Sequence, residues 1–213
     1  MWPDRAAAYI VADPVDLTQI EDISKYRSCA GHDRSGWSFE QTLETDRSMK
    51  HYFFPVPAFQ GTTDKVKMFA PFDGAVTAIS LEKDKVGGRP HNGNGITLSP
   101  DLDKNAFFGF GHIYFVHDFK VGDRVKAGDL LGYAALGDKG NDFDLDLMGP
   151  QQGPTEILGS IFDHMSPKVL ADFAAVGVTP QNVIITQADR DASPCDFANG
   201  SGRPGPDWVT LTR

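Results

Sequence analysis

Apolar and polar residues alternate in short runs through the middle of the chain, which predicts a mostly β protein. Between Val66 and Met148 these runs are separated by Gly, Pro, Asn or Asp at intervals of about 8–12 residues. Ser48–Pro55 has the same pattern and predicts a further strand that proline ends. This spacing of short strands and turns is typical of a β-sandwich or barrel.

Two hairpin-like segments within this region resemble each other. Val66–Val76 places a Pro-Phe-Asp-Gly turn between two alternating strands, and Phe119–Gly132 places Gly-Asp pairs between short strands. Asp-Gly and Gly-Asp are strong turn signals because these residues accept a positive φ. Together the segments predict a barrel-sandwich hybrid core (a duplicated hybrid motif), in which two similar hairpin halves wrap around each other.

Helical periodicity is confined to the carboxy-terminal part of the chain. Apolar residues recur at helical spacing over 161–176, which predicts one amphipathic helix. Short strands are predicted over 183–186 and 208–211. The predicted organisation is an amino-terminal extension that packs on the core, a β domain, and a carboxy-terminal helix–strand extension of the same domain, over residues 1–47, 48–148 and 149–213.

Composition narrows the class of protein and of partner. The 213 residues are 40% hydrophobic and 23% charged, which suits a globular domain with one core. The net charge of −9 argues against nucleic acid or an anionic membrane as a partner. No apolar run approaches the roughly 18–20 residues of a membrane span, so we expect none.

The two cysteines bear on the compartment. Cys29 and Cys195 lie near opposite ends of the chain and permit one disulfide; the alternative is two free thiols of a cytosolic protein. We expect the disulfide, and with it an extracytoplasmic location, periplasmic or secreted. Met1–Asp4 has no basic segment leading into an apolar run, so we expect the signal peptide to be absent from this sequence.

Two families share the motifs found in the paired hairpins. Ala-Pro-x-Asp-Gly at 70–74 and Val-Gly-Asp-x-Val-x-Ala-Gly at 121–128 resemble both lipoyl or biotinyl carrier domains and lysostaphin-type (LytM-like) zinc endopeptidases. A carrier domain needs an exposed lysine several residues before the first motif, and Lys65 lies too close to Pro71 for that pattern.

The order of the intervening motifs is similar to that of the peptidases. A Gly-Asn-type strand at 94–98 and an aromatic-x-His strand at 110–113 separate the two hairpin motifs, as in that family. The resemblance covers about residues 48–148. It implies the LytM-like β fold and a family that cuts peptidoglycan cross-bridges.

The metal-binding positions of that family are replaced here. The resemblance implies zinc held by a His, an Asp four residues later, and the second His of a His-x-His pair. His51 matches the first ligand, but Pro55 stands four residues later, and Asp142 and Asp144 occupy the His-x-His positions. His112 alone keeps its match to a catalytic histidine. We therefore expect the endopeptidase activity to be lost and no cofactor to be required; zinc or calcium is the alternative, since carboxylates suit harder ions.

Two loops contribute further candidates. Gly-His-Asp-Arg-Ser at 31–35 and Ser-Met-Lys-His-Tyr at 48–52 resemble motifs of uncharacterised secreted proteins with degenerate peptidase-like domains, which implies no known activity. Their titratable residues would serve as metal ligands or as an acid–base pair, or, alternatively, as a structural polar network. The candidate catalytic residues are His112, His51 and His32, and the candidate metal ligands are His51, Asp142, Asp144 and Asp33.

Two classes of function follow from these features. The first is a binding module that has lost the zinc ligands and recognises cell-wall glycan, peptide or a protein partner. The alternative is a metal-dependent hydrolase, or another metalloenzyme, that uses replaced ligands around His51, His112, Asp142 and Asp144.

Overall fold

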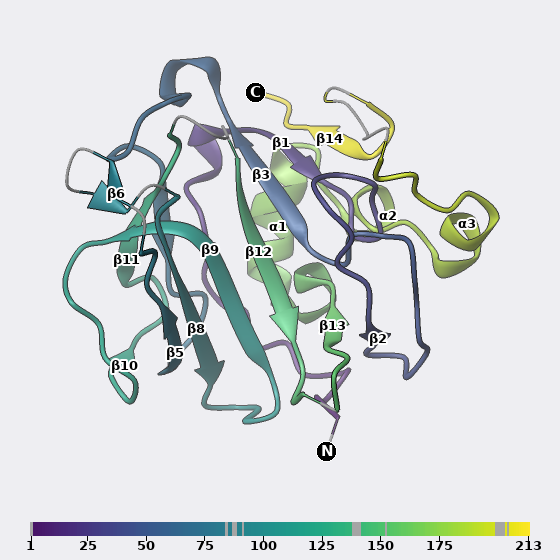
Figure 1. Cartoon of the computed structure of the whole chain (residues 1–213), viewed down its shortest axis with the longest axis horizontal. Helices are drawn as coiled ribbons and strands as arrows, with labels where there is room; N and C mark the ends of the chain where they lie inside the picture. Colours follow the sequence, from purple (N-terminus) through teal and green to yellow (C-terminus); the bar gives the residue numbers. More distant parts are fainter. Residues whose placement is uncertain are drawn as a thin grey trace.

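The computed structural model describes residues 2–83, 85–86, 89–90, 92–137, 142–151, 153–198, 203 and 205–213. These residues form a mostly β fold, which confirms the predicted fold class (Figure 1). The strands are β1 (Ile20–Ser24), β2 (Trp37–Ser38), β3 (His51–Pro55), β4 (Lys67–Phe69), β5 (Gly74–Ser80), β6 (Lys85–Val86), β7 (Arg89–Pro90), β8 (Asn94–Pro100), β9 (Phe107–Phe115), β10 (Arg124–Val125), β11 (Leu130–Ala134), β12 (Phe143–Met148), β13 (Ile157–Gly159) and β14 (Trp208–Thr210). The helices are η1 (Leu17–Gln19), η2 (Pro57–Phe59), η3 (Ile161–His164), α1 (Pro167–Ala175), α2 (Pro180–Val183) and α3 (Gln187–Ala192).

One large sheet organises the described part of the chain. Its central path runs β10-β5-β8-β9-β12-β3-β1-β14, with β11 paired to β4 and β9, and β13 paired to β12 and β2. Its pairs are antiparallel apart from β13 with β2. Both extensions join it, because β1 lies between β3 and β14 (Figure 1).

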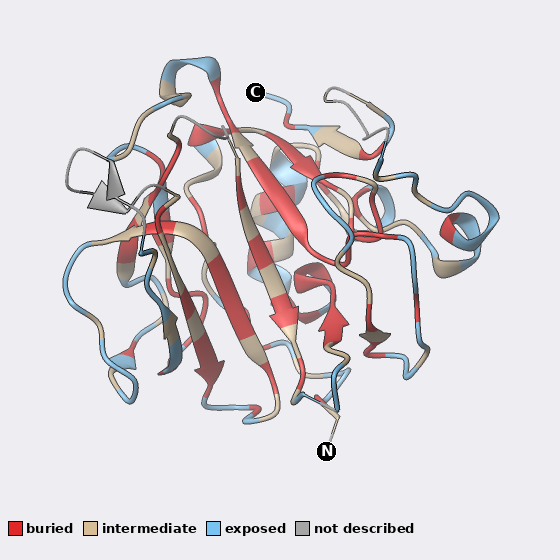
Figure 2. Cartoon of the chain, in the orientation of Figure 1, coloured by how far each residue is buried: buried red, intermediate tan, exposed pale blue. Residues whose placement is uncertain are grey.

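The two faces of the sheet differ in burial. In β12, Phe143, Leu145 and Leu147 are buried, whereas the residues between them are half-buried (Figure 2). The buried residues face the core, where the Phe143 ring stacks on that of Phe53 with centroids 5.5 Å apart. The aspartates of β12 therefore lie on the opposite, outer face, as the alternation of the sequence predicts.

Helices cover the inner face. Figure 1 shows α1 behind the central strands. Its buried Val169 and Phe173 belong to the main core cluster, and Phe173 packs edge-on against Phe162 of η3 with centroids 5.1 Å apart. None of the helices within the described residues is both long enough and apolar enough to cross a membrane.

The carboxy-terminal elements differ from two predictions. The helix predicted over 161–176 is divided into η3 and α1, because Ser166 caps the second helix and Pro167 occupies its first position. The strand predicted over 183–186 is absent, since α2 ends at Val183 and only Ile184 makes an isolated bridge, to Tyr26. Pro180 favours the short helix over a strand because it starts a helix without losing a hydrogen bond.

Candidate functional site

A polar cluster lies on the outer face where β3 pairs with β12, and we call it the Lys50 cluster. It consists of His32, Lys50, Tyr52, His112 and Asp144. Tyr52 and Asp144 are directly opposite each other in the antiparallel pair, so their side chains share one face. The ammonium of Lys50 is at the centre of the cluster.

The Lys50 ammonium is held by several partners. Lys50 Nζ donates to Asp144 Oδ2 at 2.7 Å and lies 4.7 Å from the Tyr52 ring centroid. It also lies 3.2 Å from His32 Nε2. Because His32 Nδ1 contacts the Asp33 carbonyl at 2.9 Å, Nδ1 carries the proton and Nε2 accepts from the ammonium. Burial lowers the pKa of Lys50, but Asp144 and Tyr52 together more than offset this and the net shift is upward, so the amine is protonated at neutral pH.

His112 borders the cluster at its more exposed end. It is one of four described non-glycine residues with positive φ, at 57°. Its Nδ1 contacts the Asn92 carbonyl at 2.8 Å, so Nδ1 donates and Nε2 faces Asp144 Oδ2 at 3.9 Å. Its side chain is 42% exposed, which leaves the imidazole accessible to a ligand.

Two glycines make room for the cluster. A Cβ at Gly111 would lie 2.3 Å from Asp144 Oδ1, and one at Gly31 would lie 2.1 Å from the Tyr52 hydroxyl. Gly31 also has a φ of +70°, which L side chains rarely adopt. Glycine at these positions therefore permits the carboxylate and the phenol to lie against the backbone.

The acidic outer face of β12 is only partly neutralised. Asp146 Oδ2 accepts from Arg34 Nη2 at 2.8 Å, and Arg34 Nη1 pairs with Glu156 at 2.6 Å. Burial, followed by repulsion from Asp144, raises the pKa of Asp146. Burial is also the main cause of the raised pKa of Asp142. The face thus combines fixed cations with carboxylates that are costly to ionise.

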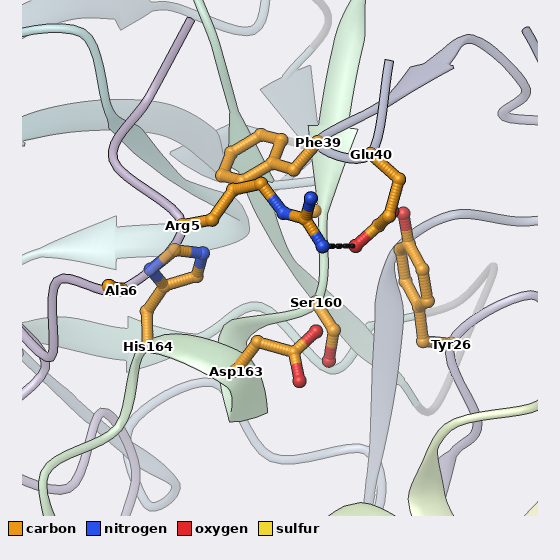
Figure 3. Close-up of a pocket in the computed structure, with 9 residues that line it drawn as sticks. Arg5, Ala6, Tyr26, Phe39, Glu40, Ser160, Asp163 and His164 are labelled. Carbon is orange, nitrogen blue, oxygen red and sulfur yellow. Dashed lines mark ion pairs between the residues drawn. The ribbon is translucent and has the colours of Figure 1, made fainter. Parts of the chain in front are cut away.

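His51 lies on the other side of the sheet. Its register partner is Leu145, and the imidazole is fully buried, 5.0 Å from the Phe162 ring. Its Nδ1 contacts the Ser24 carbonyl at 2.9 Å and its Nε2 contacts Ser160 Oγ at 3.1 Å. Ser160 lines a separate pocket (Figure 3). Both ring nitrogens of this predicted ligand and catalytic residue are therefore engaged inside the core.

This burial predicts a pH dependence of stability. Burial lowers the pKa of His51 to about 4, whereas the unfolded chain titrates near the ordinary 6.5. The unfolded state thus binds more protons between these values. Stability from neutral His51 is fully present above pH ~6.5 and is lost as the pH falls towards ~4, by about 3 kcal/mol in all.

Urea unfolding of the wild-type protein and of His51→Gln across this range measures the effect. We expect a smaller loss of stability on acidification in the variant. Equal pH slopes would contradict a buried neutral His51. Burial also lowers the pKa of His164. Because His164 is present in both proteins, its contribution to the pH dependence cancels in the comparison.

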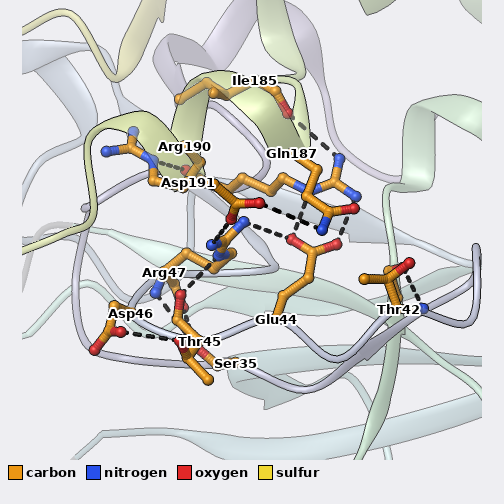
Figure 4. Close-up of polar contacts among 12 residues, drawn as sticks. Ser35, Thr42, Glu44, Thr45, Asp46, Arg47, Ile185, Gln187, Arg190 and Asp191 are labelled. Carbon is orange, nitrogen blue, oxygen red and sulfur yellow. Dashed lines mark hydrogen bonds and ion pairs between the residues drawn. The ribbon is translucent and has the colours of Figure 1, made fainter.

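Asp33 is on the loop of His32 but does not join the cluster by a direct contact among the described residues. Its carboxylate accepts from Ser35 Oγ at 2.5 Å. The loop itself is anchored by a buried network in which Glu44 binds two arginines (Figure 4). Arg27 Nε and Arg47 Nη1 lie 2.7 Å and 2.8 Å from Glu44 Oε2, and the Glu44 side chain is 0% exposed.

The carboxy-terminal segment holds the same loop. Cys29 and Cys195 form a disulfide, as predicted, with their Cα atoms 5.3 Å apart. The backbone amide of Cys195 donates to the Asp46 carbonyl at 3.0 Å, and Arg47 Nη2 pairs with Asp191 of α3 at 2.5 Å. The loop that carries His32 is therefore fixed at both ends.

The described residues do not fit a zinc site. Zinc requires three or four donors around one point, but the Lys50 ammonium lies between Asp144 and His32, and His51 faces the core. Within the described residues, no group of three or more His, Cys, Asp or Glu side chains is arranged to hold a metal ion.

Sequence reasoning did not select Lys50 or Tyr52 as site residues. The signal that could have identified them is the alternation of side chains along the predicted strand. If His51 faces the core, its neighbours Lys50 and Tyr52 face outward. Pro55, Asp142 and Asp144 indicated that the zinc pattern of the family is replaced. They did not indicate that the Lys50 ammonium lies against Asp144.

Comparisons with known proteins give structural similarity only. No protein-family model matches the chain, and no curated protein matches it in sequence. The chain is similar to a putative glycyl-glycine endopeptidase LytM of Ruminococcus gnavus, with 20% identity, a TM-score of 0.39, and coverage of 69% of this chain and 59% of that one. The catalytic domain of lysostaphin from Staphylococcus simulans has 19% identity and a TM-score of 0.35, with coverage of 59% of this chain and 84% of that one. Helicobacter pylori Csd3 has 13% identity and a TM-score of 0.43, with coverage of 98% of this chain and 48% of that one. The first two belong by name to the peptidase type that the sequence motifs resemble.

Proposed function

We propose that the chain is a non-catalytic, extracytoplasmic module that binds cell-wall glycan or peptide through the Lys50 cluster. The observation that supports this most directly is the ammonium of Lys50, which lies within hydrogen-bonding distance of Asp144 and His32. Asp144 is one of the positions where the family resemblance puts a metal ligand. A side-chain cation beside this carboxylate supports the proposal that the cluster acts without a metal.

The cluster has the chemistry of a recognition surface. It presents the Asp144 carboxylate and two imidazoles around the largely buried ammonium of Lys50 and ring of Tyr52. Glycans and peptides present hydroxyl, amide and carboxylate groups, which such a mixed set of donors and acceptors can bind. The disulfide between Cys29 and Cys195 agrees with an oxidising compartment, where cell-wall ligands are found.

A pull-down with purified peptidoglycan tests this proposal. We expect the wild-type protein to be retained on the insoluble fraction, unchanged by a chelator, without releasing soluble peptides. Lys50→Met should weaken retention about tenfold, because a charge-assisted hydrogen-bonding group of about 1.5 kcal/mol is lost. His112→Gln should also weaken retention. Because the His112 side chain is 42% exposed, this substitution should leave the fold intact.

Lys65→Met is the matched control, because the Lys65 side chain is 54% exposed and its ammonium lies 3.6 Å from the carboxylate of Asp64. It should bind like the wild-type protein. Equal retention of the Lys50→Met and Lys65→Met variants would contradict a role of the cluster. Release of peptides that both a chelator and His112→Ala abolish would instead establish the metal-dependent hydrolase.

A further inference from the structure

A second polar site lies apart from the Lys50 cluster and shares no residue with it. It is a pocket of about 380 Å³ between the amino-terminal segment, the loop after β2 and the start of η3 (Figure 3). The charged and ring-bearing residues that line it are Arg5, Tyr26, Phe39, Glu40, Asp163 and His164.

The charges of the pocket are unequally matched. Glu40 pairs with Arg5 and with Arg27, each at 3.5 Å. The side chain of Asp163, in contrast, has neither an ion pair nor a hydrogen bond within the described part of the chain. Desolvation is the main cause of its raised pKa, and the charges of His164, Arg27 and Arg5 nearby lower that pKa. The residue as a whole is exposed to solvent.

A buried acceptor faces the same space. His164 is 2% exposed, and its Nδ1 contacts the Ala7 carbonyl at 2.9 Å. Nδ1 therefore donates, and Nε2 keeps its lone pair. Burial lowers the pKa of His164, so the ring is neutral at neutral pH. Nε2 has no hydrogen bond to another described residue, and Figure 3 shows the imidazole directed into the pocket alongside Asp163.

Two aromatic side chains complete the wall. Tyr26 and Phe39 are 2% and 3% exposed and both line the pocket. Aromatic rings attract cations, and the Asp163 carboxylate adds a negative charge beside them. Asp163 and His164 Nε2 are acceptors on two separate side chains. An ammonium has three donors and can therefore donate to both while its stem lies against the aromatic rings.

We propose that this pocket binds a primary alkylammonium group, with Asp163 as its counter-ion and His164 Nε2 as a second acceptor. A ligand of this class has an ammonium on a short apolar stem, as in a lysine side chain or a diamine. The exposed guanidinium of Arg5 reaches across the pocket to Glu40, so it opposes the incoming charge (Figure 3).

NMR titration of the full chain with butylammonium chloride tests the proposal, with butanol and butyrate as neutral and anionic analogues. We expect saturable shifts at the lining residues with a Kd of about millimolar, as befits a ligand of so few atoms. Asp163→Asn should weaken binding about tenfold or more, whereas Arg5→Ala should strengthen it several-fold, because a like charge is removed.

Asp172→Asn is the matched control. Asp172 pairs with Lys168 on the surface of α1, so this variant changes the net charge equally without altering the pocket, and its affinity should match the wild type. Thermal melting of each variant confirms folding. The proposal is overturned if butylammonium fails to bind, if butanol binds as tightly, or if the Asp163→Asn and Asp172→Asn variants bind alike. None of these results affects the proposed role of the Lys50 cluster.

Discussion

Replacement of Glu44 by glutamine is expected to lower the free energy of unfolding by about 3–5 kcal/mol. The Glu44 side chain is fully buried and binds the guanidinium groups of Arg27 and Arg47, whose own side chains are 9% and 4% exposed. Without the carboxylate, two desolvated cations lose their common counter-ion (Figure 4). Removing one member of a buried charge network costs far more than removing an exposed pair.

Glu40→Gln provides the matched control. It is the same substitution beside the same Arg27, but the Glu40 side chain is 42% exposed and lies 3.5 Å away. We expect it to cost less than about 1 kcal/mol. Chemical denaturation of both variants measures the difference. Similar losses in the two proteins would show that the Glu44 network does not stabilise the fold as its burial indicates.

Removal of the disulfide is expected to have an effect of similar size, about 5 kcal/mol. Cys29 and Cys195 are separated by 166 residues, so the cross-link strongly restricts the unfolded chain. In the chain-entropy model the stabilisation grows with the logarithm of this loop length. The folded arrangement should persist in the reduced protein, because Asp46, Arg47 and Asp191 still join the same segments.

Denaturation of the oxidised protein, the reduced protein and a Cys29→Ser/Cys195→Ser variant measures this contribution. The reduced and substituted proteins should agree, which separates the loss of the cross-link from the effect of the new side chains. Alkylation of the unreduced, denatured protein should modify neither cysteine. Two alkylated thiols, or equal stability of all three forms, would contradict the prediction.

Much of the fold could be predicted from sequence because the relevant signals are local. Alternation in the sequence separates Phe143, Leu145 and Leu147 from the intervening aspartates onto opposite faces of one strand. The structure shows that the apolar face is the buried one. The Ala-Pro-x-Asp-Gly turn similarly ends in β5, which starts at Gly74. The helix after residue 160 was less predictable. Its apolar periodicity continues through Ser166 and Pro167, where a cap starts a new helix.

The composition of the site depends on pairing between distant strands, which is why sequence alone did not define it. The motif match placed His51 with Asp142 and Asp144 because it compares order along the chain. Register decides which residues share a face, and it places Tyr52 rather than His51 opposite Asp144. The position of His32 beside Lys50 also depends on the loop that Glu44 anchors. Strand periodicity in the sequence does not predict the conformation of that loop. The roles of the predicted site residues stay predictions for the experiments above.

The position of β1 between β3 and β14 has a consequence for how the chain folds. Asp22 pairs with Thr210 across 188 residues, so one edge of β1 has no partner until almost the whole described chain is available. Pairing of β3 with β12 likewise joins residues far apart in sequence. Folding dominated by such distant contacts is slow, because each closure costs loop entropy before the contact stabilises it. The sheet should therefore assemble late and cooperatively, after synthesis of its last strand rather than progressively from its first.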